Sequence, residues 1–353
     1  MNSFAVSQAY VAQGSDLLVQ KKYQDHGYAS RTMQSRAACP CLPEDVTALQ
    51  ALELAGLNWK VEKAVPQIMT PNGISYAENS TALYRSDTGK ILGIHSDAYE
   101  PVQNTTIAAI FDSLGSRAVI ESALSCRDGR RIYVTARIDA EEEITPGDRL
   151  RRYLHVFNSH DGGTSFGAFF TTQRLACANQ MSGNIRRAGR KAKDESKAMT
   201  FKHTRGVQQF AEELPQRIDM QRLQFRSEVE SLRDLTRISM TEELARRILE
   251  VTYADKLATP IRDKQTGQKR PRHLYDLKER REILTLADGL AHGSELPGFR
   301  GSAWGFLNSI TEYETHGGNL SNPEKARKRL EALYNGAAGH RIELARNACL
   351  ALV

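Results

Sequence analysis

Three turn sequences containing glycine or aspartate limit most strongly how this chain can fold, because each separates two segments with strand-like alternation. Asp87 to Gly89 divides "SYAENSTALYRSDTGKILGIH", and Arg127 to Gly129 precedes the alternating residues 132–138. Ser159 to Gly163 divides "RRYLHVFN" from "TSFGAFFTT". Asn, Asp and Gly favour turns because they adopt positive φ or bond to their own backbone. The sequence therefore predicts three antiparallel β-hairpins.

Helical spacing occurs around and after these hairpins. "EDVTALQALELAG" and "NTTIAAIFDSLGS" have it, the second ending at Gly115, and "QRLACANQMSGNIRRAG" places Leu175, Met181 and Ile185 for a helix. From residue 206 onward strand signals nearly vanish, and segments such as "TEELARRILEVTYADKL" are amphipathic. We expect an α+β fold, with an antiparallel β-hairpin sheet carrying helices on one face, followed by a mainly helical C-terminal lobe.

This pattern divides the chain into three regions. We expect a polar N-terminal arm at 1–45, an α+β core with a basic segment at 46–205, and a helical C-terminal lobe at 206–353. The length of 353 residues, with 40% hydrophobic and 25% charged residues, suits a folded protein with a sizeable core.

The same composition bears on the compartment. No apolar run approaches the roughly 18–20 residues that span a bilayer, and the first residues lack the layout of a signal peptide. Five scattered cysteines do not form a disulfide framework. We therefore expect a cytoplasmic protein with no membrane partner.

Positive charge is concentrated in one place. "RRAGRKAKDESKAMTFKHTR", residues 186–205, holds eight basic and two acidic residues, a net +6 that equals the net charge of the whole chain. Such a cluster is typical of a segment that holds a polyanion, although a solvated connector has the same composition. Its basic residues are Arg186, Arg187, Arg190, Lys191, Lys193, Lys197, Lys202 and Arg205.

His160 and Asp161 raise the question of a metal site, since an imidazole and a carboxylate can share a divalent cation. Further ligands would have to come from elsewhere, and the spacing of the candidates matches no zinc or two-metal signature. We therefore predict a turn at Ser159 to Gly163 and keep metal-dependent hydrolysis as an alternative. The candidates for these further ligands are His155, His203, Asp139, Glu141, Glu142 and Glu143. We expect the four acidic residues among them, at 139–143, to lie in a solvated loop.

A second polar row lies on a predicted helix. In "AWGFLNSITEYETH", Asn308, Glu312 and His316 are spaced i, i+4, i+8 and share one face, while Leu307, Ile310 and Tyr313 lie on another. Such a row can bind a metal, but we favour side-chain hydrogen bonds that join two parts of the fold.

The remaining chemical signals are weak. Cys39 and Cys41 are too isolated for a zinc knuckle, and Cys177, between two alanines, is expected to be a buried cysteine rather than a nucleophile. No Walker loop, dinucleotide fingerprint or nucleophile elbow occurs. We expect no cofactor and assign no catalytic residue.

Several motifs occur together in a characteristic order. "WKVE", "ALYRSDTGKILGIHSDAYEPVQN", "NSHDGG", "TTQRLACAN" and "GSAWGFLNSITEYETH" cover most of residues 55–320. In this order they resemble the phage/plasmid-like protein family, known mainly as a domain of unknown function, and the resemblance implies a mobile element in a bacterial host cell. The layout of hairpins, helix and basic segment is also similar to single-strand annealing recombinases of the RecT, Erf and Red-beta kind, by analogy and without a diagnostic motif.

From these observations we expect a non-catalytic protein that binds single-stranded DNA and anneals strands during phage or plasmid recombination. Binding without sequence preference needs cations for phosphates and flat groups for bases. Arg151, Arg152, Arg174 and the eight basic residues above are the candidate cations. Tyr153 and Phe157 are candidates for base stacking, together with Phe166 and Phe169, although aromatics alternating in a strand are more often core residues.

Annealing also implies a particular set of partners. Displaying a long strand requires several subunits, so we expect a homo-oligomer in the form of a ring or filament. A host or phage replication or recombination protein is a further possible partner. The alternatives from other classes are a metal-dependent nuclease that uses His160 and Asp161, and a mobile-element protein that binds a host defence factor.

Overall fold

The computed structural model describes residues 10–11, 46–176, 179–180, 198–201, 206–263, 265–317, 328–329, 332–334 and 336–353. Of residues 10–11, 179–180, 198–201 and 206–211 it describes the backbone. The predicted arm at 1–45 lies outside this part of the chain except for residues 10–11.

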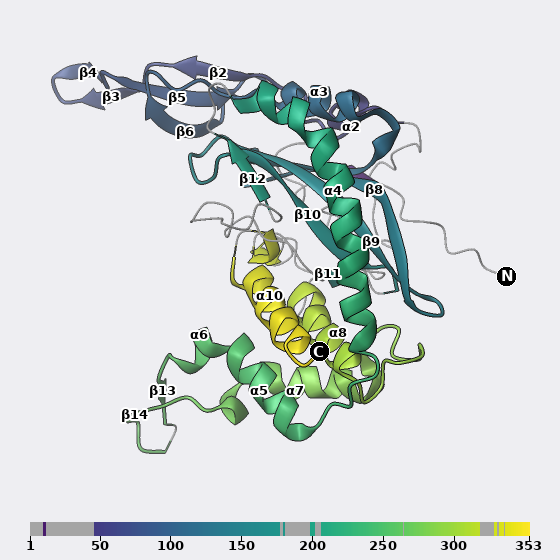
Figure 1. Ribbon diagram of the computed structural model, residues 1–353. Helices are drawn as coiled ribbons and strands as arrows, with labels where there is room; N and C mark the ends of the chain where they lie inside the picture. Colours follow the sequence, from purple (N-terminus) through teal and green to yellow (C-terminus); the bar gives the residue numbers. More distant parts are fainter. Residues whose placement is uncertain are drawn as a thin grey trace.

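A seven-stranded sheet forms the centre of the molecule (Figure 1). Its order is β1-β7-β8-β9-β10-β11, and β12 also pairs with β10. All pairings are antiparallel except that of β1 with β7. The α+β fold expected from the sequence is therefore confirmed. The strands are β1 (Tyr10–Val11), β7 (Ala118–Cys126), β8 (Arg131–Thr145), β9 (Asp148–Ser159), β10 (Phe166–Arg174), β11 (Asn179–Gln180) and β12 (Ala198–Phe201).

The hairpin turns lie where the sequence predicts them. Arg127, Asp128 and Gly129, between β7 and β8, all have positive φ, at 55°, 59° and 88°. Gly162, between β9 and β10, has φ 69°. These values are in the left-handed region that glycine and aspartate tolerate best. The predicted turns at 127–129 and 159–163 are confirmed.

Two smaller sheets extend from one end of the molecule. β2 (Val61–Ala64), β5 (Ser80–Arg85) and β6 (Ile91–Ser96) form a three-stranded sheet in the order β2-β5-β6. Its β5–β6 turn contains Gly89 at φ 69°, which confirms the remaining predicted hairpin. β3 (Gln67–Thr70) and β4 (Gly73–Tyr76) make a separate two-stranded hairpin that projects from the upper end in Figure 1.

Helices cover one face of the central sheet. α2 (Ala48–Leu54), α3 (Asn104–Leu114) and the long α4 (Gly206–Asp234) contact β7, β9 and β8, respectively. Figure 1 shows α4 running along the sheet. Alternate strand side chains such as Val134, Leu154 and Val156 are fully buried beneath these helices, because successive residues of a strand point to opposite faces. The helix predicted to end at Gly115 does so.

The C-terminal part is mainly helical, as expected. Its elements are α5 (Glu242–Thr252), α6 (Ala254–Leu257), β13 (Ile261–Arg262), β14 (Lys269–Arg270), η3 (Leu274–Asp276), α7 (Lys278–Thr285), η4 (Leu286–Leu290), α8 (Ala303–His316) and α10 (Ala337–Leu350). One buried apolar cluster includes Val134 and Leu154 of the sheet together with Trp304 and Cys349. The boundary at 205/206 stays a prediction, but side chains from both sides share a core.

Two predictions were wrong. The acidic residues at 139–143 lie in β8 instead of a loop, where Glu141 pairs with Arg149 at 3.3 Å and Glu142 with Arg226 at 3.4 Å. Their charge is therefore compensated within strand and helix. The segment expected to begin a helix at Gln173 instead finishes β10 and forms β11.

Among the described residues, no helix is long and apolar enough to cross a bilayer.

Candidate nucleic-acid interface

Residues 181–197, which we call the basic segment, follow β11 and precede β12, and both of these strands pair with β10. β11 pairs with Gln173 and Arg174 at one end of β10, and β12 pairs with 166–169 at the other. Residues 181–197 connect these two strands and carry six basic and two acidic residues, a net +4. The side chains predicted to bind phosphate in this segment and just beyond it lie outside the described residues: Arg186, Arg187, Arg190, Lys191, Lys193, Lys197, Lys202 and Arg205.

Arg151 and Arg152 lie on opposite faces of β9, and both are paired. Arg151 donates to Glu141 through Nε at 2.8 Å. Arg152 faces α4, where it donates to Gln221 and lies 3.3 Å from a Glu228 oxygen. Only 7% of the Arg152 side chain is exposed. We therefore leave Arg152 out of the proposed interface, because a phosphate would have to displace its partners inside the core.

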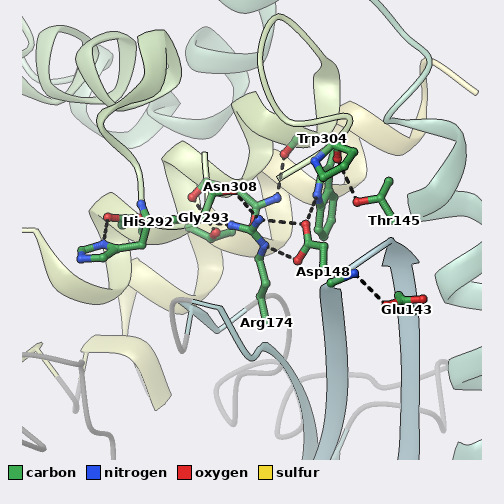
Figure 2. Close-up of polar contacts among 12 residues, drawn as sticks. Glu143, Thr145, Asp148, Arg174, His292, Gly293, Trp304 and Asn308 are labelled. Atoms are coloured by element: carbon green, nitrogen blue, oxygen red, sulfur yellow. Dashed lines mark hydrogen bonds and ion pairs between the residues drawn. The ribbon is translucent and has the colours of Figure 1, made fainter. Parts of the chain in front are cut away.

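Among the predicted cations whose side chains the structure describes, Arg174 is the most buried, and Figure 2 shows its contacts. Its Nε and one terminal nitrogen donate to the two oxygens of Asp148 at 2.6 and 2.8 Å. The guanidinium also donates to the carbonyls of His292 at 2.9 Å and Gly293 at 3.1 Å. Its central carbon lies 5.1 Å from the Phe299 ring centre, at cation–π distance. Arg174 fastens the sheet to the loop before α8 and is not available to a ligand in this arrangement.

Two further contacts complete this network. Trp304, the second residue of α8, donates its indole N–H to Asp148 at 2.9 Å. Gly293 has φ 71°, and a Cβ there would lie 3.0 Å from an Arg174 nitrogen, so glycine suits both the backbone and the space. A carboxylate that accepts from both an arginine and an indole balances the buried charge.

One member of the polar row on α8, Glu312, joins two parts of the fold through hydrogen bonds. Glu312 accepts from the His292 backbone N–H at 3.0 Å and lies 2.5 Å from His292 Nδ1. Burial by itself raises the pKa of Glu312, but the hydrogen bonds and charge of His292, with His316, lower it below its usual value. Asn308 donates to the Trp304 carbonyl within the helix at 2.8 Å. The favoured interpretation is supported for Glu312.

The predicted stacking aromatics are in the core. Tyr153 and Phe157 are 3% and 1% exposed, and Phe166 and Phe169 are fully buried. Phe157 contacts Phe169 with ring centres 5.9 Å apart. These rings pack against each other and the rest of the core, so we leave them out of the interface.

His160 and Asp161 are held by separate partners at the β9–β10 turn. The His160 ring contacts Asn104 Oδ1 through Nε2 at 3.0 Å. Asp161 accepts from Ser159 Oγ at 2.6 Å and from the Gly163 N–H at 2.8 Å. Burial acts to raise the pKa of Asp161, but these bonds and the nearby charges of two arginines, Arg131 and Arg127, lower it. The contacts of both residues are therefore explained by the turn and by the residues packed against it.

The metal alternative has no support from the part of the chain that the structure describes. Within it, no group of three or more His, Cys, Asp or Glu side chains is placed to hold a metal ion. His155 is instead bonded to Thr135 and Thr171, and burial lowers its pKa to about 3. His203, Cys39, Cys41 and Cys177 lie outside the described residues.

Sequence reasoning missed two important residues. Asp148 follows a glycine in a turn-like stretch, and its contact with Trp304 is 156 residues away along the chain, so no local pattern indicates it. His155 was considered only as a metal-ligand candidate, and the signal that it is a core residue was its place on one face of β9 with Tyr153 and Phe157, both of which are buried.

The geometry defines an α+β protein with a mainly antiparallel sheet, and its sequence matches a known family. The family model "Domain of unknown function (DUF932)" matches residues 91–334, more than half of the chain. The chain belongs to this family. No curated protein and no solved structure matches it.

Proposed function

We propose that this protein binds single-stranded DNA and anneals complementary strands, without catalysis and without a cofactor, in phage or plasmid recombination. The observation that carries the proposal is the basic segment at 181–197, whose two ends both lie at β10. A segment whose two ends are fixed to one strand loses less entropy when its cations contact a nucleic acid than a segment with free ends.

The resemblance to single-strand annealing recombinases suggests that the polyanion held by the basic segment is single-stranded DNA. Phosphate contacts supply affinity without sequence preference, which suits a protein that must accept any complementary strand. Arg151 pairs with Gln173, beside β11, but only 11% of its side chain is exposed and Glu141 binds it, so we leave it out of the proposed interface as well. The oligomeric ring or filament and a replication or recombination partner belong to the same proposal.

The test replaces Arg186, Arg187, Arg190 and Lys191 with Gln. Affinity for unrelated single-stranded oligonucleotides should fall by similar factors. The slope of log affinity against log salt should flatten by roughly 3, from about 0.7 for each lost phosphate contact.

A matched control removes the same charge elsewhere. Lys60, Lys90, Arg117 and Arg130 are exposed and lie outside the basic segment, so their replacement with Gln should leave the slope nearly unchanged. Equal slopes for wild type and the first variant, with both folded, would reject the basic segment as the binding site.

The nuclease alternative is tested in the same preparation. Incubation of labelled single- and double-stranded DNA with Mg²⁺ or Mn²⁺ should leave the DNA intact. Cleavage that His160→Ala and Asp161→Asn abolish would replace the proposed function with a metal-dependent one.

A further inference from the structure

A short basic hairpin in the C-terminal part lies apart from the central sheet. β13 and β14 form it, and it projects from the lower side of the molecule in Figure 1. Gly267 has φ 70° in its turn, and Asp263 accepts from the N–H groups of Gln265 and Thr266 at 2.9 and 2.8 Å. The turn is therefore ordered by its own hydrogen bonds.

The acidic side chains beside the hairpin are already engaged. Asp276 accepts two hydrogen bonds from Arg270, both at 2.7 Å, and one from the His273 N–H at 2.8 Å. Asp263 is held by the turn and lies 3.6 Å from Arg270. The hydrogen bond from Arg270 lowers the pKa of Asp276 below its usual value. Both carboxylates are thus directed to Arg270.

Other cations of the hairpin have no such partner. Arg262, Lys269 and Arg272 form no ion pair within the described residues, and the first two are exposed. By contrast, the exposed Arg246 of α5 is paired with Glu243 at 2.8 Å and Glu250 at 2.7 Å. The positive charge of Arg262, Lys269 and Arg272 is therefore uncompensated locally and available to an anion.

An exposed aromatic ring follows these cations in the chain. Tyr275 is 70% exposed, and its ring stacks on that of His273 with centres 5.3 Å apart and planes 14° from parallel. The two-pronged bond of Arg270 to Asp276 joins β14 to the turn that carries Tyr275. The strand that carries Lys269 is therefore connected to the turn that carries Tyr275.

We infer that Arg262, Lys269, Arg272 and Tyr275 form a second contact for single-stranded nucleic acid, separate from the basic segment. Cations beside an exposed ring match the two chemical parts of an unpaired strand, the phosphate and the base. A duplex keeps its bases stacked and offers no free face to Tyr275. This inference rests on the proposed function, because both require that the chain bind single strands.

The test treats charge and ring separately in the full-length protein. Replacing Arg262, Lys269 and Arg272 with Gln should flatten the salt dependence of oligonucleotide binding by roughly 2. Tyr275→Ala should weaken binding roughly 5- to 100-fold, the range expected for one lost base stack, and Tyr275→Phe should restore it. Tyr76→Ala is the matched control, because Tyr76 is 60% exposed on the uncharged β3–β4 hairpin.

An oligonucleotide that lacks bases isolates the stacking contact. Wild type and Tyr275→Ala should bind this backbone equally, whereas the triple Gln variant should still bind it more weakly. A loss for Tyr275→Ala that is the same with and without bases would overturn the stacking contact.

The remaining outcomes distinguish this inference from the proposed function. If the hairpin variants bind as wild type while the variant of the basic segment is weakened, the inference is wrong and the proposed function stands. If wild type binds no oligonucleotide, both are wrong. If the hairpin variants lose affinity equally for polyglutamate and DNA, the surface is a general anion site and the inference is also overturned.

Discussion

Replacement of His155 should change how the stability of the protein depends on pH. The His155 ring is fully buried on β9, bonded to Thr135 Oγ1 at 2.9 Å and Thr171 Oγ1 at 2.8 Å, and stacked on Phe169 with ring centres 4.6 Å apart. Burial lowers its pKa from 6.5 to about 3. The folded protein therefore keeps this ring neutral at pH values where an exposed histidine gains a proton.

The sign and size of the effect follow from linkage. The stability contributed by the neutral ring is fully present above about pH 6.5 and is lost as pH falls toward 3, because the unfolded chain binds the proton first. For these two pKa values the loss between pH 7 and pH 5 is about 2 kcal/mol, at 1.36 kcal/mol per pKa unit.

The assay is urea unfolding at pH 7, 6 and 5 for wild type, His155→Gln and Thr171→Val. The free energy of unfolding of wild type relative to His155→Gln should fall by about 2 kcal/mol from pH 7 to pH 5, since other groups titrate in both proteins. Thr171→Val removes a hydrogen-bond partner but no titrating group, so its cost of about 1–3 kcal/mol should stay constant. A difference for His155→Gln that does not vary with pH would refute the reasoning.

Three further predictions concern the buried ion pair, the turn and assembly. Arg174→Met should lower the free energy of unfolding by about 3–5 kcal/mol in urea titrations, because it leaves the Asp148 carboxylate buried without its cation, and adding Asp148→Asn should recover part of this loss. His160→Ala should leave the metal content of the purified protein unchanged by elemental analysis, and stoichiometric metal that disappears in the variant would contradict the turn interpretation. Light scattering should give a mass several times 39.4 kDa, whereas a strict monomer with and without DNA would favour the defence-factor alternative.

The features that the sequence predicts well depend on neighbouring residues. The turn at 127–129 and the end of α3 at Gly115 were correct, because positive φ is a property of a few adjacent residues. The acidic run at 139–143 was placed in a loop, because charge is usually solvated, but in β8 it is compensated by arginines of β9 and α4. Long-range pairing decided that case.

The candidate site was predictable only in part. The charge of residues 186–205 is a property of composition and needs no fold. Whether a particular arginine is exposed depends on what packs over it, and Arg174 faces residues more than a hundred positions later in the chain. Spacing within α8 did indicate that Glu312 shares a polar face with Asn308 and His316, since residues four apart lie on one face. It did not indicate that His292 is the partner of Glu312.

The contact between Asp148 and Trp304 has a consequence for the order of folding during synthesis. The two residues are 156 positions apart, so at 5–20 residues per second the ribosome adds Trp304 roughly 8–30 s after Asp148. The hairpins β7 to β10 have short connections and can form within this interval, before Trp304 is present to donate to Asp148 and before His292 and Gly293 are present to accept from Arg174. Until α8 has been synthesised, the Asp148–Arg174 ion pair of the nascent sheet is therefore uncovered. A chaperone can bind there, and a protease can cut the chain there, during that interval.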